Sequence, residues 1–272
     1  MRRILHRNHR NHRNHRNYRN HLLALVSVAV LALPQRSLGQ QRGFGGGGRS
    51  RQPTEFAANV PYDGRFTFAR IKYSMPMEGF GDIKWSHDYP RGERHFTKIV
   101  GELSTIRART QHSNILTLDD PELFKFPVAY LCEAGFWRPS DAEVLGLRNY
   151  LTKGGFIIFD DFAGSAWMNF ALQMQRVLPK AKLVKLTVDH PIFDSFYKIK
   201  NLDYRHPYFG MPSEFYGIFE NNDPSRRLLA IVNYNNDISE YWEFSDEGFF
   251  PIDMSNEAYK LGVNYLVYAL TR

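Results

Sequence analysis

The 272-residue chain has a single cysteine, Cys132. One cysteine excludes an intramolecular disulfide and any zinc site built from several thiolates. Cys132 also lacks the Gly-x-nucleophile-x-Gly pattern of a nucleophile elbow, because Tyr130 and Ala134 stand at the two glycine positions. A lone cysteine between apolar residues is most often a small buried side chain. We therefore expect no catalysis by this thiol.

Acidic residues are absent before Gln40, where the chain carries eight arginines. Removing these arginines from the 35 basic residues leaves 27 against 28 acidic residues. The rest of the chain thus has a formal charge of −1, although the whole chain has +7. Nucleic-acid binding depends on clustered Lys and Arg that neutralise phosphates. The sequence therefore predicts no nucleic-acid partner.

The apolar run at 22–33 is too short to cross a membrane as a helix, which needs about 20 residues. It follows a repeat of Arg-Asn-His units at 7–21 and precedes small residues. This order is typical of a secretory signal peptide. We predict that residues 1–39 are a signal peptide, cleaved near Gly39 or kept as an N-terminal anchor, and that the protein is exported to the periplasm or cell envelope. Membrane contact would come only through this segment if it stays uncleaved.

Glycine and arginine dominate the segment after the predicted cleavage site, and residues 40–64 are predicted to be a flexible linker. The histidines of the Arg-Asn-His repeat could chelate a metal ion, but the simpler interpretation is a repeat that is discarded with the signal peptide. We predict no cofactor and no metal site.

From residue 65 onward, short apolar runs alternate with amphipathic segments. Several runs are apolar at consecutive positions, which is typical of strands covered by helices on both faces. Alternation of strands and helices with fewer than eight strands favours a single α/β domain at 65–272, a three-layer sandwich with a mostly parallel sheet, over a barrel. The predicted strands are 66–73, 114–118, 128–132, 156–160, 183–186 and 228–232.

Four segments have apolar residues at helical spacing, and the predicted helices are 96–106, 140–151, 167–177 and 258–268. The second is the clearest, because Ser140 and Glu143 form a capping-box pattern at its start. Residues 201–227 show no clear period and are predicted to form loops at the edge of the sheet.

Polar side chains follow several predicted strands, and ligands bind open α/β sheets outside the carboxyl ends of the strands. The strand at 228–232 is followed by Asn233, Asn235, Asn236 and Asp237, and the segment at 189–193 follows the strand at 183–186. The candidate ligand-binding residues at these ends are Glu133, Gly135, Asp160, Asp161, His190, Asn233 and Asn235.

The adjacent carboxylates Asp160 and Asp161 have two interpretations. They could act as a general acid and base or as ligands of a hard metal ion, with His190 as a third group. Alternatively, one caps the helix that begins near Gly164 and the other pairs with a cation. Adjacent strand residues point to opposite faces, so we expect at most one of the two to line a site.

Three segments, LTLDDPELFKFPVAYL, SDAEVLGLRNYLTKGGFIIFDDF and DHPIFDSFY, resemble the bacterial domain-of-unknown-function family 4159 in their order and spacing. The resemblance extends from Phe66 to the C-terminus and implies a flavodoxin-like or class I glutamine amidotransferase-like fold. Amidotransferases of that class use a Cys, His and Glu triad. Here no His-x-Glu follows late in the chain, so glutaminase activity is not expected, and the resemblance implies no reaction.

Two functions are compatible with these features. The first is an exported cell-envelope domain that binds a small-molecule ligand or a protein partner at the strand ends without catalysis. The second is a hydrolase-type enzyme that uses Asp161 with Asp160, Glu133 or His190. Convergent polar groups with a raised carboxyl pKa would favour the enzyme, whereas an apolar aromatic patch would favour partner binding.

Deletion of residues 1–39 is expected to leave a soluble, folded protein, because the predicted domain begins well after Gln40. The check is size-exclusion chromatography with thermal denaturation of the shortened chain. Aggregation would show that the apolar run at 22–33 is part of the fold.

Overall fold

Seven strands form one sheet in the computed structural model, which describes residues 55–75 and 82–272. The strands are β1 (Phe66–Ile71), β2 (Ala108–Leu116), β3 (Val128–Cys132), β4 (Phe156–Phe162), β5 (Val184–Lys185), β6 (Glu214–Phe219) and β7 (Leu228–Tyr234). Their order across the sheet is β2-β1-β3-β4-β7-β6-β5. The strands from β2 to β7 in this order are parallel, and β6 is antiparallel to both of its neighbours.

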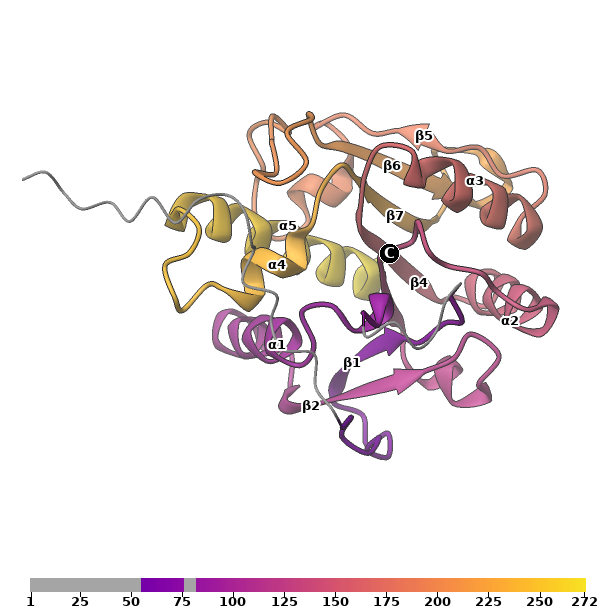
Figure 1. Ribbon diagram of the computed structural model, residues 1–272, viewed down its shortest axis with the longest axis horizontal. Coiled ribbons are helices and arrows are strands. Elements are labelled where there is room, and N and C mark those ends of the chain that lie inside the picture. Colours follow the sequence, from indigo (N-terminus) through magenta and orange to yellow (C-terminus); the bar gives the residue numbers. More distant parts are fainter. Residues whose placement is uncertain (1–54, 76–81) are drawn as a thin grey trace, which may run out of the picture. The chain divides into compact units, whose positions relative to one another are not determined.

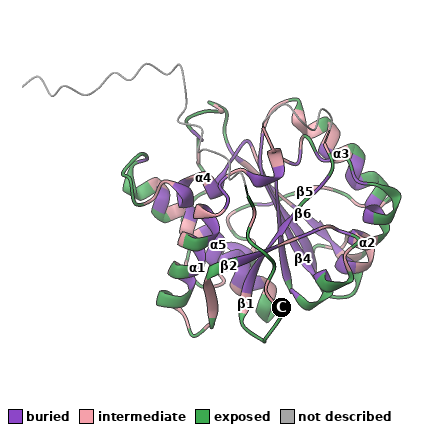
Figure 2. Ribbon diagram, turned by 60° about the horizontal axis from the view of Figure 1, so that its bottom comes forward, coloured by how far each residue is buried: buried purple, intermediate pink, exposed green. Residues whose placement is uncertain are grey.

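Helices cover both faces of this sheet (Figure 1). One face carries α1 (Arg91–Leu103), α4 (Ile238–Glu243) and α5 (Ile252–Thr271), and the other carries α2 (Asp141–Thr152) and α3 (Ala166–Val177). Successive residues of β3 alternate between the two cores: Tyr130 packs with the first group, and Ala129 and Leu131 pack with the second. Burial on both faces explains the continuous apolar runs, and the strands are buried between the two helical layers in Figure 2. The predicted α/β sandwich with a mostly parallel sheet is confirmed.

The capping box predicted for α2 is present. Ser140 Oγ accepts a hydrogen bond from the Glu143 amide at 3.2 Å, and Glu143 Oε2 accepts one from the Ser140 amide at 2.8 Å. Two amides that the helix leaves without partners are thereby satisfied. Inside α2, Gly146 lies so close to the chain after β2 that an added Cβ would stand 2.0 Å from the Leu118 carbonyl oxygen.

The strand order begins as the doubly wound order 2-1-3-4 and then departs from it, because β7 occupies the fifth position. The prediction that residues 201–227 form loops was wrong, since β6 lies within this segment. Its sequence EFYGIF has a glycine in the middle and little alternation, and it becomes a strand by pairing with both β5 and β7. The short helix α4 was also not predicted.

Residues 55–64, the described end of the predicted linker, have no helix or strand but are held against the domain. Asn59 exchanges two hydrogen bonds of 2.8 Å with the backbone of Ile115, and Phe56 packs on Trp85 at 4.8 Å between ring centroids. The predicted signal peptide and the rest of the linker lie outside the described residues. Among the described helices, none is both long and apolar enough to cross a membrane.

Replacement of Gly146 by Ala is expected to destabilise the domain by about 1–3 kcal/mol, because the new methyl group would overlap the Leu118 carbonyl. The matched control is Gly101→Ala in α1, where nothing lies within 4 Å of the added atom. There the better helix propensity of alanine should stabilise the domain by up to about 1 kcal/mol. Urea denaturation measures both changes, and equal effects at the two positions would contradict the packing argument.

Candidate functional site

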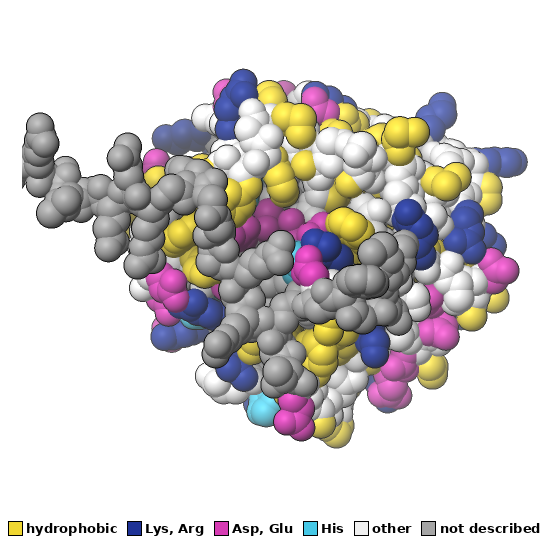
Figure 3. Space-filling model, viewed as in Figure 1, with side chains coloured by type: hydrophobic (Ala, Val, Ile, Leu, Met, Phe, Trp, Pro, Cys, Tyr) yellow, Lys and Arg dark blue, Asp and Glu magenta, His cyan; other side chains and the backbone are white. Residues whose placement is uncertain are grey.

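Charged side chains from four separate segments converge at the carboxyl ends of the parallel strands. Glu133 follows β3, Asp161 lies near the end of β4, and Asp237 follows β7. The segment between β1 and α1 adds His87 and Asp88. The strand order reverses between β1 and β3, so this segment and Glu133 meet at the switch point, where open α/β sheets bind ligands. Figure 3 shows acidic side chains gathered near the middle of one face, next to a histidine.

The backbone turns sharply at each of these strand ends. Positive φ angles occur at Asp88 (63°), Glu133 (51°), Asp161 (57°) and Asn235 (56°). This conformation costs about 1–2 kcal/mol for most residues and less for Asp and Asn. At Asp161 it interrupts the alternation of β4, and the pairing of β4 with β7 shifts register between Phe159 and Phe162. Local strain of this kind is frequent at functional sites.

Asp160 is fully buried, and its carboxylate accepts hydrogen bonds from three neighbouring segments. Its Oδ2 accepts hydrogen bonds from the Tyr130 hydroxyl at 2.9 Å and from the Ile238 amide at 3.0 Å, the latter at the start of α4. Its Oδ1 accepts one from Asn233 at 3.0 Å. The expectation that an aspartate caps the helix near Gly164 was wrong, because α3 has no side-chain cap and Asp160 instead binds the first amides of α4.

Asp161 has a different role, because its Oδ2 has no hydrogen-bond partner among the described residues although the residue is only 6% exposed. His87 Nδ1 lies 3.5 Å from this oxygen and 3.2 Å from Glu133 Oε1. Lys84 lies at the rim and pairs with Glu133 at 3.1 Å and with Asp82 at 2.8 Å. Of the two adjacent aspartates, only Asp161 therefore has an oxygen that makes no hydrogen bond within the described residues and could meet a ligand.

Two further buried carboxylates, Asp88 and Asp237, complete the floor of the site. The hydroxyl of Ser239 donates a hydrogen bond to either of them and lies 2.6 Å from the Tyr130 hydroxyl, whose single proton is shared between Ser239 and Asp160. Oxygens of Asp88, Asp161 and Asp237 lie within 4.8 Å of one another. Three carboxylates at this spacing repel one another when they are ionised.

Burial and mutual repulsion raise the pKa values of this group. Burial, with Asp237 as the main neighbour, raises the pKa of Asp88 to about 7, and burial raises that of Asp160 to about 7. The pKa of Asp237 is likewise raised to about 7 by burial and by Asp160. For Asp161, burial and the charges of Asp237, Glu133 and Asp88 raise the pKa well above its usual value.

The cluster continues toward α4 through Glu240 and His206, which lie with Asp237 in a second group of potential ligand atoms. Burial and the neighbouring Asp237 raise the pKa of Glu240 to about 10, whereas burial lowers the pKa of His206 to about 4. Nε2 of His206 has no partner within the described part of the chain, and its Nδ1 accepts a hydrogen bond from the Tyr208 amide at 3.4 Å.

Cys132 lies beneath the site but is sealed from it. Its Sγ donates toward the Lys84 and Trp85 carbonyl oxygens, each at 3.3 Å, and accepts a hydrogen bond from Arg70 at 3.2 Å. Burial raises the pKa of this thiol well above its usual value, so it stays neutral and is a poor nucleophile. The buried Arg70 is itself neutralised by Glu93 at 2.6 Å.

The other predicted site residues have structural contacts. Asn233 and Asn235 tie strand ends and loops together: the first binds Asp160, and the second accepts from the Gly164 amide at 3.1 Å. Gly135 packs against Ala166 of α3 too closely for a side chain.

The structure does not bring His190 to the carboxylates. Its Nδ1 accepts from the Ile192 amide at 3.3 Å, and its ring packs on Phe219 and Tyr268. Phe219 pairs with Leu228 at the amino end of β7, which is the opposite edge of the sheet.

Sequence reasoning missed His87, Asp88 and Glu240 as site residues and noted Asp237 only as a polar residue after a strand. Ligands bind open α/β sheets outside the carboxyl ends of the strands, and this rule applies to β1 as well as to the other strands. Its use there would have pointed to the long segment that precedes α1. Glu240 had no such signal, because α4 was not predicted.

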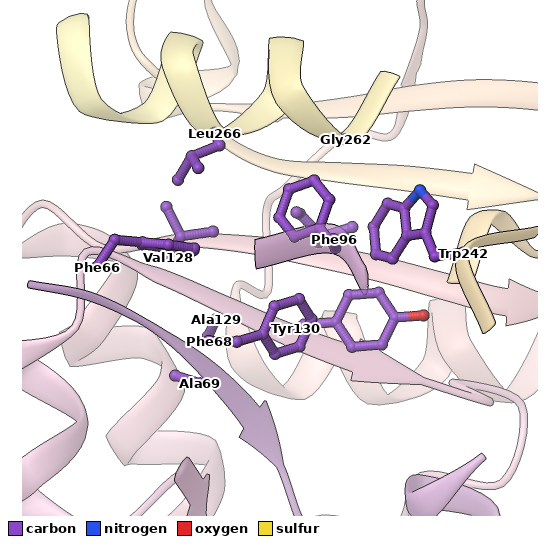
Figure 4. A pocket seen from close by; sticks show the side chains of 11 residues that line it. Phe66, Phe68, Ala69, Phe96, Val128, Ala129, Tyr130, Trp242, Gly262 and Leu266 are labelled. Carbon is purple, nitrogen blue, oxygen red and sulfur yellow. The ribbon is translucent and has the colours of Figure 1, made fainter. Parts of the chain in front are cut away.

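An apolar cavity lies beside this site, between the sheet and helices α1 and α5 (Figure 4). Its volume of about 10 Å³ is no larger than one water molecule requires. The ring of Tyr130 lines the cavity while its hydroxyl points away from it (Figure 4), toward Asp160. The cavity is therefore a packing defect of the core and not a ligand site.

Fold and site together define an α/β domain with an acidic site at the switch point of a mainly parallel sheet. The chain belongs to the family described as domain of unknown function DUF4159, whose model matches residues 67–270. No curated protein matches the chain.

The domain is expected to lose stability as the pH rises from about 5 to about 7. Raised pKa values mean that the folded state holds protons which the unfolded state has already released. While it stays protonated in the folded state, each such group costs up to about 1.4 kcal/mol per pH unit, and the loss levels off above its folded-state pKa of about 7. Thermal denaturation in the presence of a chelator should show a lower Tm at the higher pH.

Asp161→Asn should reduce this pH dependence without lowering the Tm at pH 8.5, because it removes one buried charge and Asn tolerates a positive φ. The exposed Asp194→Asn is the matched control and should behave as wild type. A collapse of stability in Asp161→Asn would show that this side chain is structural.

Proposed function

We propose that this protein is an exported cell-envelope domain that binds a cationic ligand in the acidic site at the carboxyl ends of β3, β4 and β7. The observation that carries the proposal is the open Oδ2 of Asp161, buried among Glu133, Asp88 and Asp237. A buried carboxylate oxygen normally has a hydrogen-bond or ionic partner. His87 Nδ1 lies 3.5 Å away without a hydrogen bond to this oxygen, and a positively charged ligand would supply a partner.

The charge balance of the site supports a cation over an anion. Lys84 is engaged by Asp82 and Glu133, and Arg70 is engaged by Glu93. The inner carboxylates Asp88, Asp161 and Asp237 face one another, and their raised pKa values mean that neighbouring cations such as Arg70 offset their charge only in part. A bound cation would reverse these shifts and make burial of the ionised groups favourable.

Binding without catalysis is favoured because the sulfur nucleophile at a strand end is inaccessible. Cys132 is fully buried and held by two backbone carbonyls. His190, which was considered as a supporting base, lies at the other edge of the sheet.

One observation favours a second candidate, a hydrolase-type enzyme. Burial raises the pKa of Asp161 well above its usual value, which suits a carboxyl group that acts as a general acid. In that case Asp161 would act on a water molecule or a leaving group, with Glu133 and Asp160 as neighbours, on an amide, ester or carbohydrate of the envelope.

The protein from Gln40 onward, purified gently from an exporting host, is expected to carry one bound ligand in native mass spectrometry. Asp161→Asn should lose this added mass because its neutral amide cannot compensate a cation, whereas Asp194→Asn should keep it. A bare wild-type mass, or an added mass that persists in Asp161→Asn, would contradict the proposal. Turnover of model esters or glycosides that disappears in Asp161→Asn would instead support the enzyme.

A further inference from the structure

We infer that the cation is a divalent first-row transition metal ion held by His87 Nδ1, Glu133 Oε1 and Asp161 Oδ2. This inference rests on the proposed function and specifies its ligand. The three side chains come from the segment before α1, from the end of β3 and from β4, and their ligand atoms lie within 4.8 Å of one another. Asp161 contributes the buried oxygen that has no other partner among the described residues.

The distances around His87 agree with a shared metal ion. Nδ1 lies 3.2 Å from Glu133 Oε1 and 3.5 Å from Asp161 Oδ2. Ligand atoms at about 2.1 Å from an ion lie roughly 3.0–3.4 Å apart in octahedral or tetrahedral geometry. Two of the three separations are therefore close to those around a single ion.

The other nitrogen of His87 is positioned as in many metal sites. Nε2 lies 2.7 Å from Asp82 Oδ1. When Nε2–H of the neutral ring donates to this carboxylate, Nδ1 carries a lone pair that faces Glu133 and Asp161. A carboxylate that binds the distal N–H of a ligating histidine fixes its tautomer and orientation. A metal ion at this point would accept the lone pairs of all three groups.

The second histidine of the cluster does not fit this role. His206 Nδ1 accepts a hydrogen bond from the Tyr208 amide, so in the neutral ring Nε2 carries the proton. A protonated Nε2 cannot ligate a metal. The site therefore lies at His87, Glu133 and Asp161, and Asp88 and Asp237 are near enough to Asp161 to bind the ion or its water molecules.

The donor set indicates the class of metal. Imidazole nitrogen with carboxylate oxygens suits Zn²⁺ and Mn²⁺, whereas Mg²⁺ and Ca²⁺ prefer oxygen alone. Lys84 already neutralises part of the charge of Glu133, and no contact of its ammonium group with Asp161 is present in the described structure. Asp161 is thus the ligand whose charge most needs the metal.

The test uses the full chain stripped with a chelator, in equilibrium dialysis against Zn²⁺ or Mn²⁺ with metal analysis, and Co²⁺ absorption as a spectroscopic probe. We expect one ion per chain at this site, with affinity at least 100-fold lower in Asp161→Asn and at least 10-fold lower in His87→Gln. The exposed His112→Gln is the matched control and should bind as wild type. Circular dichroism checks that each variant is folded.

The outcomes separate this inference from the proposed function. Metal binding that is unchanged in both Asp161→Asn and His87→Gln would place the ion elsewhere, for example on the histidines of the Arg-Asn-His repeat, and would overturn the assignment. Preference for Mg²⁺ or Ca²⁺ would remove His87 as a ligand. No metal binding, with an organic adduct still lost in Asp161→Asn, would reject the metal and retain the cationic ligand. Absence of both would reject both.

Discussion

The hydrogen bonds of the buried Asp160 carboxylate hold the site together. They connect β4 to Tyr130 of β3, to Asn233 of β7 and to the first amides of α4. Several such hydrogen bonds fix the orientation of the carboxylate. The loss of one partner would leave a buried polar oxygen without a hydrogen bond. Asp160 is held in place by these bonds. The positive φ angle at Asp161 then directs the Asp161 side chain toward Glu133 and Asp237.

The buried carboxylates that would bind a ligand also lower the stability of the free protein. Asp88, Asp161 and Asp237 are buried within 4.8 Å of one another, and their raised pKa values record the cost of ionising them there. A domain selected for stability alone would replace such residues by apolar ones, because buried charges rarely stabilise a fold. The neighbouring pair Arg70 and Glu93 shows the contrast, since each charge there has its partner.

The sequence was sufficient to predict the layers of the fold but only part of the site. Apolar runs and a capping box reflect local rules, so β3, β4 and α2 were predicted close to their observed bounds. β6 depends on pairing with strands on both sides, and no local pattern marks it. Glu133 and Asp161 follow runs of apolar residues and were therefore predicted as site residues. His87 and Asp88 lie in an irregular segment, and only the folded sheet brings this segment close to Glu133 and Asp161. His190 has similar local features but lies at the opposite edge.

A ligand in this site would bind to four segments that are far apart in the sequence: the residues before α1, the end of β3, the end of β4 and the start of α4. Because the unfolded chain does not hold these groups together, the binding energy adds directly to the stability of the fold, by about 2.7 kcal/mol at 100 times the dissociation constant. The same ligand would remove the repulsion between the buried carboxylates. The strain and charge concentrated at this edge of the sheet are thus a cost of the free protein that binding offsets, which is the physical reason to regard the edge as a functional site.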